Sequence, residues 1–199
     1  MSFRLVVGLG NPGPRYAATR HNAGFWFVDQ LAQAKASPFR LESRFTAELA
    51  RLRLEQAEDL WLLKPQTFMN RSGLAVQKVA AYYRIPPEAM LIVHDDLDLP
   101  PGVARLKRGG GHGGHNGLRD LHQHLGANYA RLRIGIGHPG QREDVINYVL
   151  DPPRQAELAA IMEALAASLS IFHPLITGDW DKAVRTLHSQ PKPEQETQA

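Results

Sequence analysis

Residues 109–117 read Gly-Gly-Gly-His-Gly-Gly-His-Asn-Gly and are the part of this chain most suited to chemistry. Glycine loses much conformational entropy on folding, so six glycines in nine residues are unfavourable unless the backbone must approach a ligand closely or adopt positive φ. A flexible linker would combine glycine with serine, whereas two histidines and an asparagine interrupt this stretch. The pattern therefore predicts a binding loop.

A second group of reactive side chains lies at 94–98, His-Asp-Asp-Leu-Asp. The carboxylates of Asp95, Asp96 and Asp98 could hold a hard cation such as Mg²⁺. A carboxylate at a strand end can instead cap a turn, which suits Asp98 because Leu-Pro-Pro follows it.

Histidines near these carboxylates raise the alternative of zinc, with Asp95 as a further ligand. The histidines concerned are His94, His112 and His115. Zinc needs ligands fixed in tetrahedral geometry, which a glycine-rich loop supplies poorly. We therefore expect no metal here.

Basic residues surround the glycine-rich loop, and no acidic residue lies between Asp98 and Asp120. They are Arg105, Lys107, Arg108 and Arg119, with Arg131 and Arg133 shortly after. This distribution is typical of an anion-binding face, although a solvated strand with long basic side chains would give the same pattern. The adjacent loop favours nucleic acid.

Composition limits the class of protein. The chain has 199 residues, 43% hydrophobic and 22% charged, with a formal charge of +3, as expected of one globular domain. It has no cysteine, which excludes thiolate chemistry and suits a reducing compartment. Glycines and prolines interrupt residues 1–20, and no apolar run is long enough to span a bilayer, so we expect a cytoplasmic protein without membrane contact.

Hydrophobic periodicity predicts alternating strands and helices. We expect strands at 3–8, 47–54, 60–64, 90–93, 103–107 and 131–137. We expect helices at 22–36, 72–83, 118–125, 155–169 and 179–187, the first with Asn22 as its N-cap.

This alternation predicts an α/β fold: a single domain over residues 1–188 with a mixed, mostly parallel central sheet and helices on both faces. A turn at 55–59 makes a hairpin that mixes the sheet, and 189–199 should form a disordered tail. Ligands of such sheets bind beyond the carboxyl ends of the strands, where Asn11, 94–98 and the glycine-rich loop fall.

The stretch Gly-Leu-Gly-Asn-Pro-Gly at 8–13 meets the bare dinucleotide pattern G-x-G-x-x-G. However, Pro12 and Pro14 interrupt the turn, and no helix begins before about Asn22. We therefore expect no dinucleotide, and no other cofactor.

Six motifs, in order, resemble the bacterial-type peptidyl-tRNA hydrolase family over roughly residues 5–187. They are the stretch 8–13, Thr-Arg-His-Asn-Ala-Gly at 19–24, Thr-Phe-Met-Asn-Arg-Ser-Gly at 67–73, His-Asp-Asp-Leu-Asp-Leu-Pro-Pro-Gly at 94–102, Gly-Gly-His-Asn-Gly at 113–117 and Arg-Leu-Arg-Ile-Gly-Ile-Gly at 131–137. The resemblance implies hydrolysis of the ester between a nascent peptide and the terminal ribose of tRNA, which recycles tRNA released prematurely from ribosomes.

The resemblance assigns His21 as the base that activates water and Asp95 as the carboxylate that orients it. Imidazole has an unperturbed pKa near neutrality, which suits a general base. A carboxylate at its second nitrogen would fix the tautomer and stabilise the imidazolium, as in a serine triad with water replacing serine. Asp96 and Asp98 are rival carboxylates, and a histidine at a helix start could instead make only a local hydrogen bond.

Three asparagines complete the implied catalytic site: Asn11, Asn70 and Asn116. Amides donate and accept, so Asn70 and Asn116 can hold substrate or water without adding charge. The resemblance assigns to Asn11 the discrimination of a blocked from a free amino group. A turn residue for Asn11 and an N-cap for Asn116 are the structural alternatives.

The resemblance also implies contacts to tRNA. Tyr16 and Phe68 would stack on its end, although Phe68 could belong to the core. The remaining implied contacts are His115, Arg105, Lys107 and Arg133. If three phosphates are neutralised, log affinity should fall with log salt with a slope of roughly −2 to −3.

The expected protein is therefore a monomeric esterase acting on peptidyl-tRNA without a metal. Two other classes remain open: a non-catalytic RNA-binding module of the same fold, and a metal-dependent hydrolase that uses His94, His112 and the aspartates.

Overall fold

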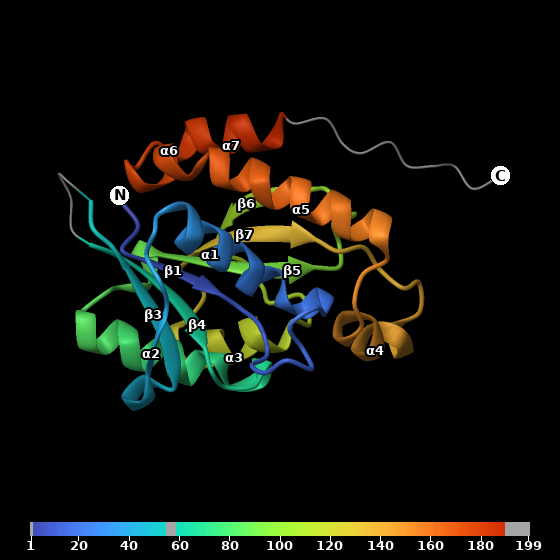
Figure 1. The fold of residues 1–199 in the computed structure, drawn as a ribbon, viewed down its shortest axis with the longest axis horizontal. Coiled ribbons are helices and arrows are strands. Elements are labelled where there is room, and N and C mark those ends of the chain that lie inside the picture. The colour runs from blue at the N-terminus through green and yellow to red at the C-terminus, as the bar shows by residue number, and fades with distance from the viewer. Residues whose placement is uncertain (1, 55–58, 190–199) are drawn as a thin grey trace.

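A computed structural model describes residues 2–54 and 59–189 and contains a seven-stranded sheet in the order β2-β3-β4-β1-β5-β7-β6 (Figure 1). The strands are β1 (Leu5–Gly8), β2 (Arg40–Glu42), β3 (Ala47–Leu52), β4 (Leu60–Pro65), β5 (Met90–Asp96), β6 (Ala104–Arg108) and β7 (Ala130–Gly135). The four central strands, β4, β1, β5 and β7, are parallel, while β2, β3 and β6 run antiparallel to their neighbours. The prediction of a mixed, mostly parallel sheet is confirmed.

Seven α-helices pack around this sheet in the described part of the chain. They are α1 (Ala23–Ala34), α2 (Ser72–Tyr83), α3 (Asn116–Leu125), α4 (Val145–Leu150), α5 (Gln155–Ser170), α6 (Phe172–Ile176) and α7 (Trp180–His188). Short 3₁₀ turns are η1 (Arg20–Asn22), η2 (Ser43–Phe45), η3 (Met69–Arg71), η4 (Pro87–Ala89) and η5 (Arg142–Asp144). Helices α1, α5, α6 and α7 cover one face of the sheet, and α2 and α3 cover the other (Figure 1).

Alternating strand residues supply the two layers of the core. In β1, Val6 packs among residues such as Phe27 on the α1 side, whereas Leu5 and Val7 pack among residues such as Val79 on the α2 side. Successive strand side chains point to opposite faces, and here both faces are covered, so β1 is apolar throughout.

The carboxyl end of β1 is in close contact with the start of α1. A Cβ atom added to Gly8, the last residue of β1, would lie 2.3 Å from the carbonyl oxygen of Gly24 near the start of α1, so no side chain fits there. This approach brings η1, which immediately precedes α1, to the carboxyl ends of the central strands.

The main elements agree with the predictions except at some ends. Strand β5 continues to Asp96 rather than ending at Val93, because residues 94–96 still pair with β7, and His94 and Asp95 are buried there despite their polarity. The hairpin is confirmed by the antiparallel pairing of β3 with β4, but residues 55–58 of its predicted turn lie outside the described residues. Residues 190–199 of the predicted tail lie outside them too.

The described residues include no helix of sufficient length and apolarity to cross a membrane.

Candidate active site

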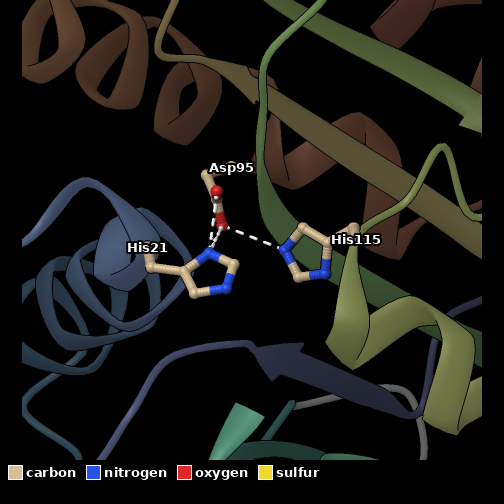
Figure 2. A group of neighbouring side chains, drawn as sticks. All are labelled: His21, Asp95 and His115. Atoms are coloured by element: carbon tan, nitrogen blue, oxygen red, sulfur yellow. Dashed lines mark hydrogen bonds and ion pairs between the residues drawn. The ribbon is translucent and has the colours of Figure 1, made fainter. Parts of the chain in front are cut away.

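Three side chains from distant segments meet at the carboxyl end of β5 (Figure 2). His21 on η1 places Nδ1 2.9 Å from each carboxylate oxygen of Asp95. His115, which precedes α3, places Nε2 3.0 Å from Oδ1 of Asp95. His21 and Asp95 are both buried, with 8% and 3% of their surface exposed. One buried carboxylate thus joins two imidazoles.

The protonation of His115 follows from its other contacts. Its Nδ1 accepts hydrogen bonds from the backbone N–H groups of Gly117 and Leu118, at 3.1 and 3.3 Å. The ring hydrogen must therefore be on Nε2, which donates to Asp95. His115 is also the N-cap of α3, so the alternative that Asn116 is the cap is wrong.

Asp95 is ionised in this environment. Burial raises the pKa of its carboxyl group, but the electrostatic interactions with His21 and His115 and the hydrogen bonds from them outweigh burial and hold the pKa well below its ordinary value. The carboxylate accepts from Nδ1–H of His21, which leaves Nε2 of His21 as the acceptor available to water.

The rival carboxylates are used elsewhere. Asp96 accepts from Nε of Arg133 at 2.7 Å and from the backbone N–H of Asp98 at 2.9 Å. Asp98 lies 4.0 Å from Nη2 of Arg133, with 82% of its side chain exposed. The carboxylate that caps the turn is therefore that of Asp96, whereas Asp98 was predicted to cap it. Neither Asp96 nor Asp98 bonds to His21 in place of Asp95.

His21, Asp95 and His115 also form a geometric cluster that could hold a metal, since one ligand atom of each lies within 4.8 Å of the others. Coordination through Nε2 of His115 would move the ring hydrogen to Nδ1, where it would oppose the two backbone N–H groups of α3. The cluster is therefore arranged for hydrogen bonding, and it does not fit a metal without loss of the helix cap.

His94 is directed away from this cluster's carboxylate. Its Nδ1–H donates to the backbone oxygen of Asp95 at 2.7 Å, and its ring lies 5.2 Å from that of His115. Burial, and then the electrostatic interaction with His115, lower the pKa of His94 to about 3, so its ring is neutral near neutral pH. His112 instead packs near His122, 5.8 Å between ring centroids.

Asn11 is fixed by its neighbours. The side chain of Asn22 accepts from the backbone N–H of Asn11 at 2.9 Å and donates to its carbonyl oxygen at 3.0 Å. Oδ1 of Asn11 then accepts from the backbone N–H of Met69 at 2.8 Å, so its Nδ2 hydrogens remain for a ligand. Asn22 is the N-cap residue of α1, as predicted, but its side chain makes no capping hydrogen bond because that amide holds Asn11 instead.

Close packing brings the three asparagine-bearing segments together. A Cβ atom added to Gly117 would lie 2.6 Å from Sδ of Met69 and 3.1 Å from Cδ1 of Leu9. Met69 precedes Asn70, and Gly117 follows Asn116, so these two exposed amides lie on adjoining segments.

Tyr16, in the segment after β1, and Phe68, in the segment after β4, form an aromatic pair. Their ring centroids lie 6.1 Å apart in an edge-to-face arrangement. Phe68 is 58% exposed, so its assignment to the core is wrong. The guanidinium group of Arg15 lies 5.7 Å from the Tyr16 ring.

Four of the basic residues predicted to face an anion form two cross-strand pairs of β6 and β7. Arg105 pairs in register with Arg133, and Lys107 with Arg131. Lys107 is exposed, while Arg133 is held by Asp96. Arg131 is 4% exposed and donates to the carbonyl oxygens of Gly109 and Gly111, so it holds the glycine-rich loop.

Sequence reasoning missed Arg20, Asn22 and Met69 as functional residues. Asn22 and Met69 orient Asn11, while Arg20 is buried beside the base. The sequence signal that could have identified them is their position in two of the six motifs: Arg20 and Asn22 lie beside His21 at 19–24, and Met69 lies beside Asn70 at 67–73.

The chain was compared with known proteins. The family model described as peptidyl-tRNA hydrolase matches residues 5–196. A peptidyl-tRNA hydrolase of Azoarcus sp. (strain BH72) is 53% identical over 191 residues, which cover 96% of this chain and 86% of that relative. A peptidyl-tRNA hydrolase of Neisseria gonorrhoeae (strain NCCP11945) is 52% identical over 190 residues, which cover 95% of this chain and 98% of that relative.

The solved structures agree with the sequence comparison. The crystal structure of peptidyl-tRNA hydrolase from Acinetobacter baumannii has a TM-score of 0.91 and 48% sequence identity, and the match covers 94% of this chain and 95% of that one.

Proposed function

The chain belongs to the peptidyl-tRNA hydrolase family and hydrolyses the ester bond of peptidyl-tRNA, and we propose that His21 activates the attacking water with Asp95 as its orienting carboxylate. The observation that supports this most is the buried hydrogen bond from Nδ1 of His21 to Asp95, at 2.9 Å. It leaves the other ring nitrogen, Nε2, able to take a proton from water.

The reaction proceeds in two proton transfers. Nε2 of His21 removes a proton from water as the oxygen attacks the ester carbonyl, giving a tetrahedral intermediate and an imidazolium. The imidazolium then returns the proton to the ribose oxygen as the ester bond breaks, which releases the peptide acid and tRNA. The charge of Asp95 stabilises the imidazolium without taking up the proton.

The amides of Asn70 and Asn116 hold the water and the developing oxyanion, because donors placed at the carbonyl oxygen stabilise charge that forms there. His115 acts on Asp95 rather than on the tRNA: its hydrogen bond fixes the carboxylate that His21 uses. This replaces the direct substrate contact expected for His115.

Asn11 selects a blocked amino group through its Nδ2–H donors. Its oxygen is already bonded to the N–H of Met69, so the NH₂ group faces the ligand as a donor. Such a donor suits the carbonyl oxygen of the acyl group that precedes the esterified residue, and it is poorly matched to a free α-ammonium, which only donates.

The tRNA end lies across Tyr16 and Phe68, and its phosphates lie toward Arg105, Lys107 and Arg133. The edge-to-face pair offers an exposed ring for stacking, and Lys107 offers an unburied charge. Arg133 contributes while bonded to Asp96. In this proposal the enzyme is a single-domain monomer, because one chain supplies every group named above, and it is cytoplasmic, because a chain without cysteine suits a reducing compartment.

A non-catalytic RNA-binding module and a metal-dependent hydrolase are disfavoured by the family membership and by the protonation of His115. The test is release of an N-acetylated amino acid from its tRNA, against the unblocked aminoacyl-tRNA, with and without chelator. Cleavage of the blocked ester alone, unaffected by chelator, supports the proposal. Tight tRNA binding without cleavage, or loss of cleavage on chelation, contradicts it.

A further inference from the structure

Arg20 is the residue before the proposed base, and its guanidinium group binds a distant part of the chain. Nη1 donates to the carbonyl oxygens of Tyr148 at 3.0 Å and Asp151 at 3.2 Å, and Nη2 donates to Oε2 of Glu157 at 2.7 Å. The same guanidinium lies 4.0 Å from the centroid of the Tyr148 ring. The backbone N–H of Arg20 also donates to Asp151, at 3.2 Å.

These partners are themselves fixed to the scaffold. The hydroxyl of Tyr148 donates to the carbonyl oxygen of Ile136, just beyond β7, at 2.6 Å. Oε2 of Glu157 accepts from the backbone N–H of Arg154 at the start of α5, at 2.9 Å. Arg20 is 5% exposed, so its charge is enclosed among these groups. It therefore connects η1 to the C-terminal end of α4 and to α5, and through Tyr148 to the residue just beyond β7.

The turn that carries His21 has little internal support. Element η1 is a three-residue 3₁₀ turn whose N-cap, Thr19, makes no side-chain capping bond. Hydrogen-bond geometry in such turns is poorer than in α-helices, so contacts from outside must fix them. Such contacts come from Asp95, from the two hydrogen bonds between Asn22 and the backbone of Asn11, and from the buried guanidinium of Arg20.

We infer that Arg20 is a positioning residue for the hydrolysis: it holds η1 so that Nδ1 of His21 meets Asp95 and Nε2 faces the ester. This inference rests on the proposed function, in which His21 is the base. Losing the anchor displaces the base and slows the chemical step, because small misplacements of a catalytic group have large effects on rate. The surfaces proposed for tRNA are untouched, so binding is retained.

A purely structural role has a different signature. If Arg20 only tied α4 and α5 to the domain, its removal would lower the free energy of unfolding and leave turnover of the folded protein unchanged. His115 provides an internal reference for His21. Both imidazoles are bonded to Asp95, but only His21 lies on η1, so only His21 should respond to the loss of Arg20.

The kinetic test compares Arg20→Met, Arg20→Lys and a destabilising control, Leu187→Ala, which truncates a buried residue of α7. All are assayed on N-acetylated aminoacyl-tRNA, below their unfolding temperatures. We expect Arg20→Met to lower kcat by about 10- to 100-fold with KM within about threefold of the wild type. The lysine variant should recover part of the loss, because it restores the charge but neither the fork nor the planar stack.

The spectroscopic test follows the imidazole N–H protons by NMR with ¹⁵N-labelled histidine. We expect the Nδ1–H signal of His21 to shift or broaden in Arg20→Met while the Nε2–H signal of His115 persists. Unchanged kcat, or equal changes in both signals, would overturn the inference. If His21→Ala retains the wild-type rate, the proposed function fails instead, whatever Arg20 does.

A second variant covers the case in which Arg20→Met does not fold. Glu157→Gln keeps the shape of the anchor and an oxygen for the backbone N–H of Arg154, but it removes the charge of the ion pair. A lower kcat, with the His21 signal altered and the His115 signal retained, supports the inference. A wild-type rate and an unaltered His21 signal contradict it.

Discussion

Asp95 receives hydrogen bonds from two imidazoles, and this shared carboxylate decides how each of them can act. His115 must carry its hydrogen on Nε2 because two backbone N–H groups occupy Nδ1. His21 has no such restriction, so its Nε2 is the one ring nitrogen of the pair that is free for water. The bonding of its neighbours, more than its own burial, identifies the base.

Replacing the carboxylate tests this arrangement. Asp95→Asn removes the charge and offers an NH₂ group where His21 and His115 both donate, so the imidazole of His21 is misoriented. We expect kcat to fall by about 10²- to 10⁴-fold while the dissociation constant for tRNA changes little. Steady-state kinetics and a tRNA-binding titration measure the two quantities; equal losses in both would show that Asp95 acts in binding.

Asn11 allows a prediction about selectivity. Asn11→Asp keeps an oxygen for the N–H of Met69 but presents a second, anionic oxygen in place of the NH₂ donor. We expect the ratio of kcat/KM for N-acetylated over unblocked aminoacyl-tRNA to fall by about tenfold or more, since each charge-assisted bond gained or lost is worth roughly 1.5–3 kcal/mol. A ratio equal to that of the wild type would show that Asn11 does not read the amino group.

At the scale of elements, the site depends on where strands and helices end. The site residues lie at the carboxyl ends of the central strands. They come from five elements: strands β1 and β5, turns η1 and η3, and the N-terminus of α3. Apolar runs predicted the strands, but the extension of β5 through His94 and Asp95 could not be predicted, because it depends on pairing with β7 and on the hydrogen bonds of Asp95 to His21 and His115, all distant in the sequence. The three-residue β2 and the short helices α4 and α6 lack a long enough pattern for prediction.

The N-terminus of α3 joins helix stability to catalysis through His115. His115→Asn retains a side chain able to cap the helix, whereas His115→Ala loses the cap, and neither reaches Asp95. We expect both variants to lose activity similarly, but only the alanine variant to lose about 1 kcal/mol of stability. Urea unfolding and kcat separate these effects; full activity in the asparagine variant would show that the bond to Asp95 is dispensable.

At the scale of the molecule, one α/β domain presents a histidine pair and three asparagines beside a basic sheet edge. The sequence motifs predicted these residues and the order of the main elements. They did not reveal which partners each side chain would find: Arg133 is held by Asp96, and the side chain of Asn22, the N-cap residue of α1, bonds to Asn11 instead of to the helix. Such pairings arise from tertiary contacts that spacing along the chain does not encode.

The stability of the whole domain should depend on pH through His94. Its pKa of about 3 in the folded protein lies below the ordinary value near 6.5, so the unfolded chain binds more protons between these limits. The free energy of unfolding should therefore fall as the pH drops from 7 to 5, by roughly 2 kcal/mol for this group.

The control for that prediction is His94→Asn, which keeps a donor near the position of Nδ1 but does not titrate. Urea unfolding of both proteins at pH 7 and pH 5 gives the difference due to His94, with the other histidines unchanged. Identical pH dependence in the two proteins would show that His94 does not carry the effect.

The most direct test of the account is single-turnover cleavage of N-acetylated aminoacyl-tRNA by His21→Ala, alongside its affinity for tRNA. We predict a rate constant lower by about 10²- to 10⁴-fold, as expected for loss of a general base, with tRNA affinity within about threefold of the wild type. A rate near that of the wild type, or a loss of affinity as large as the loss of rate, would contradict the assignment of His21 as the base.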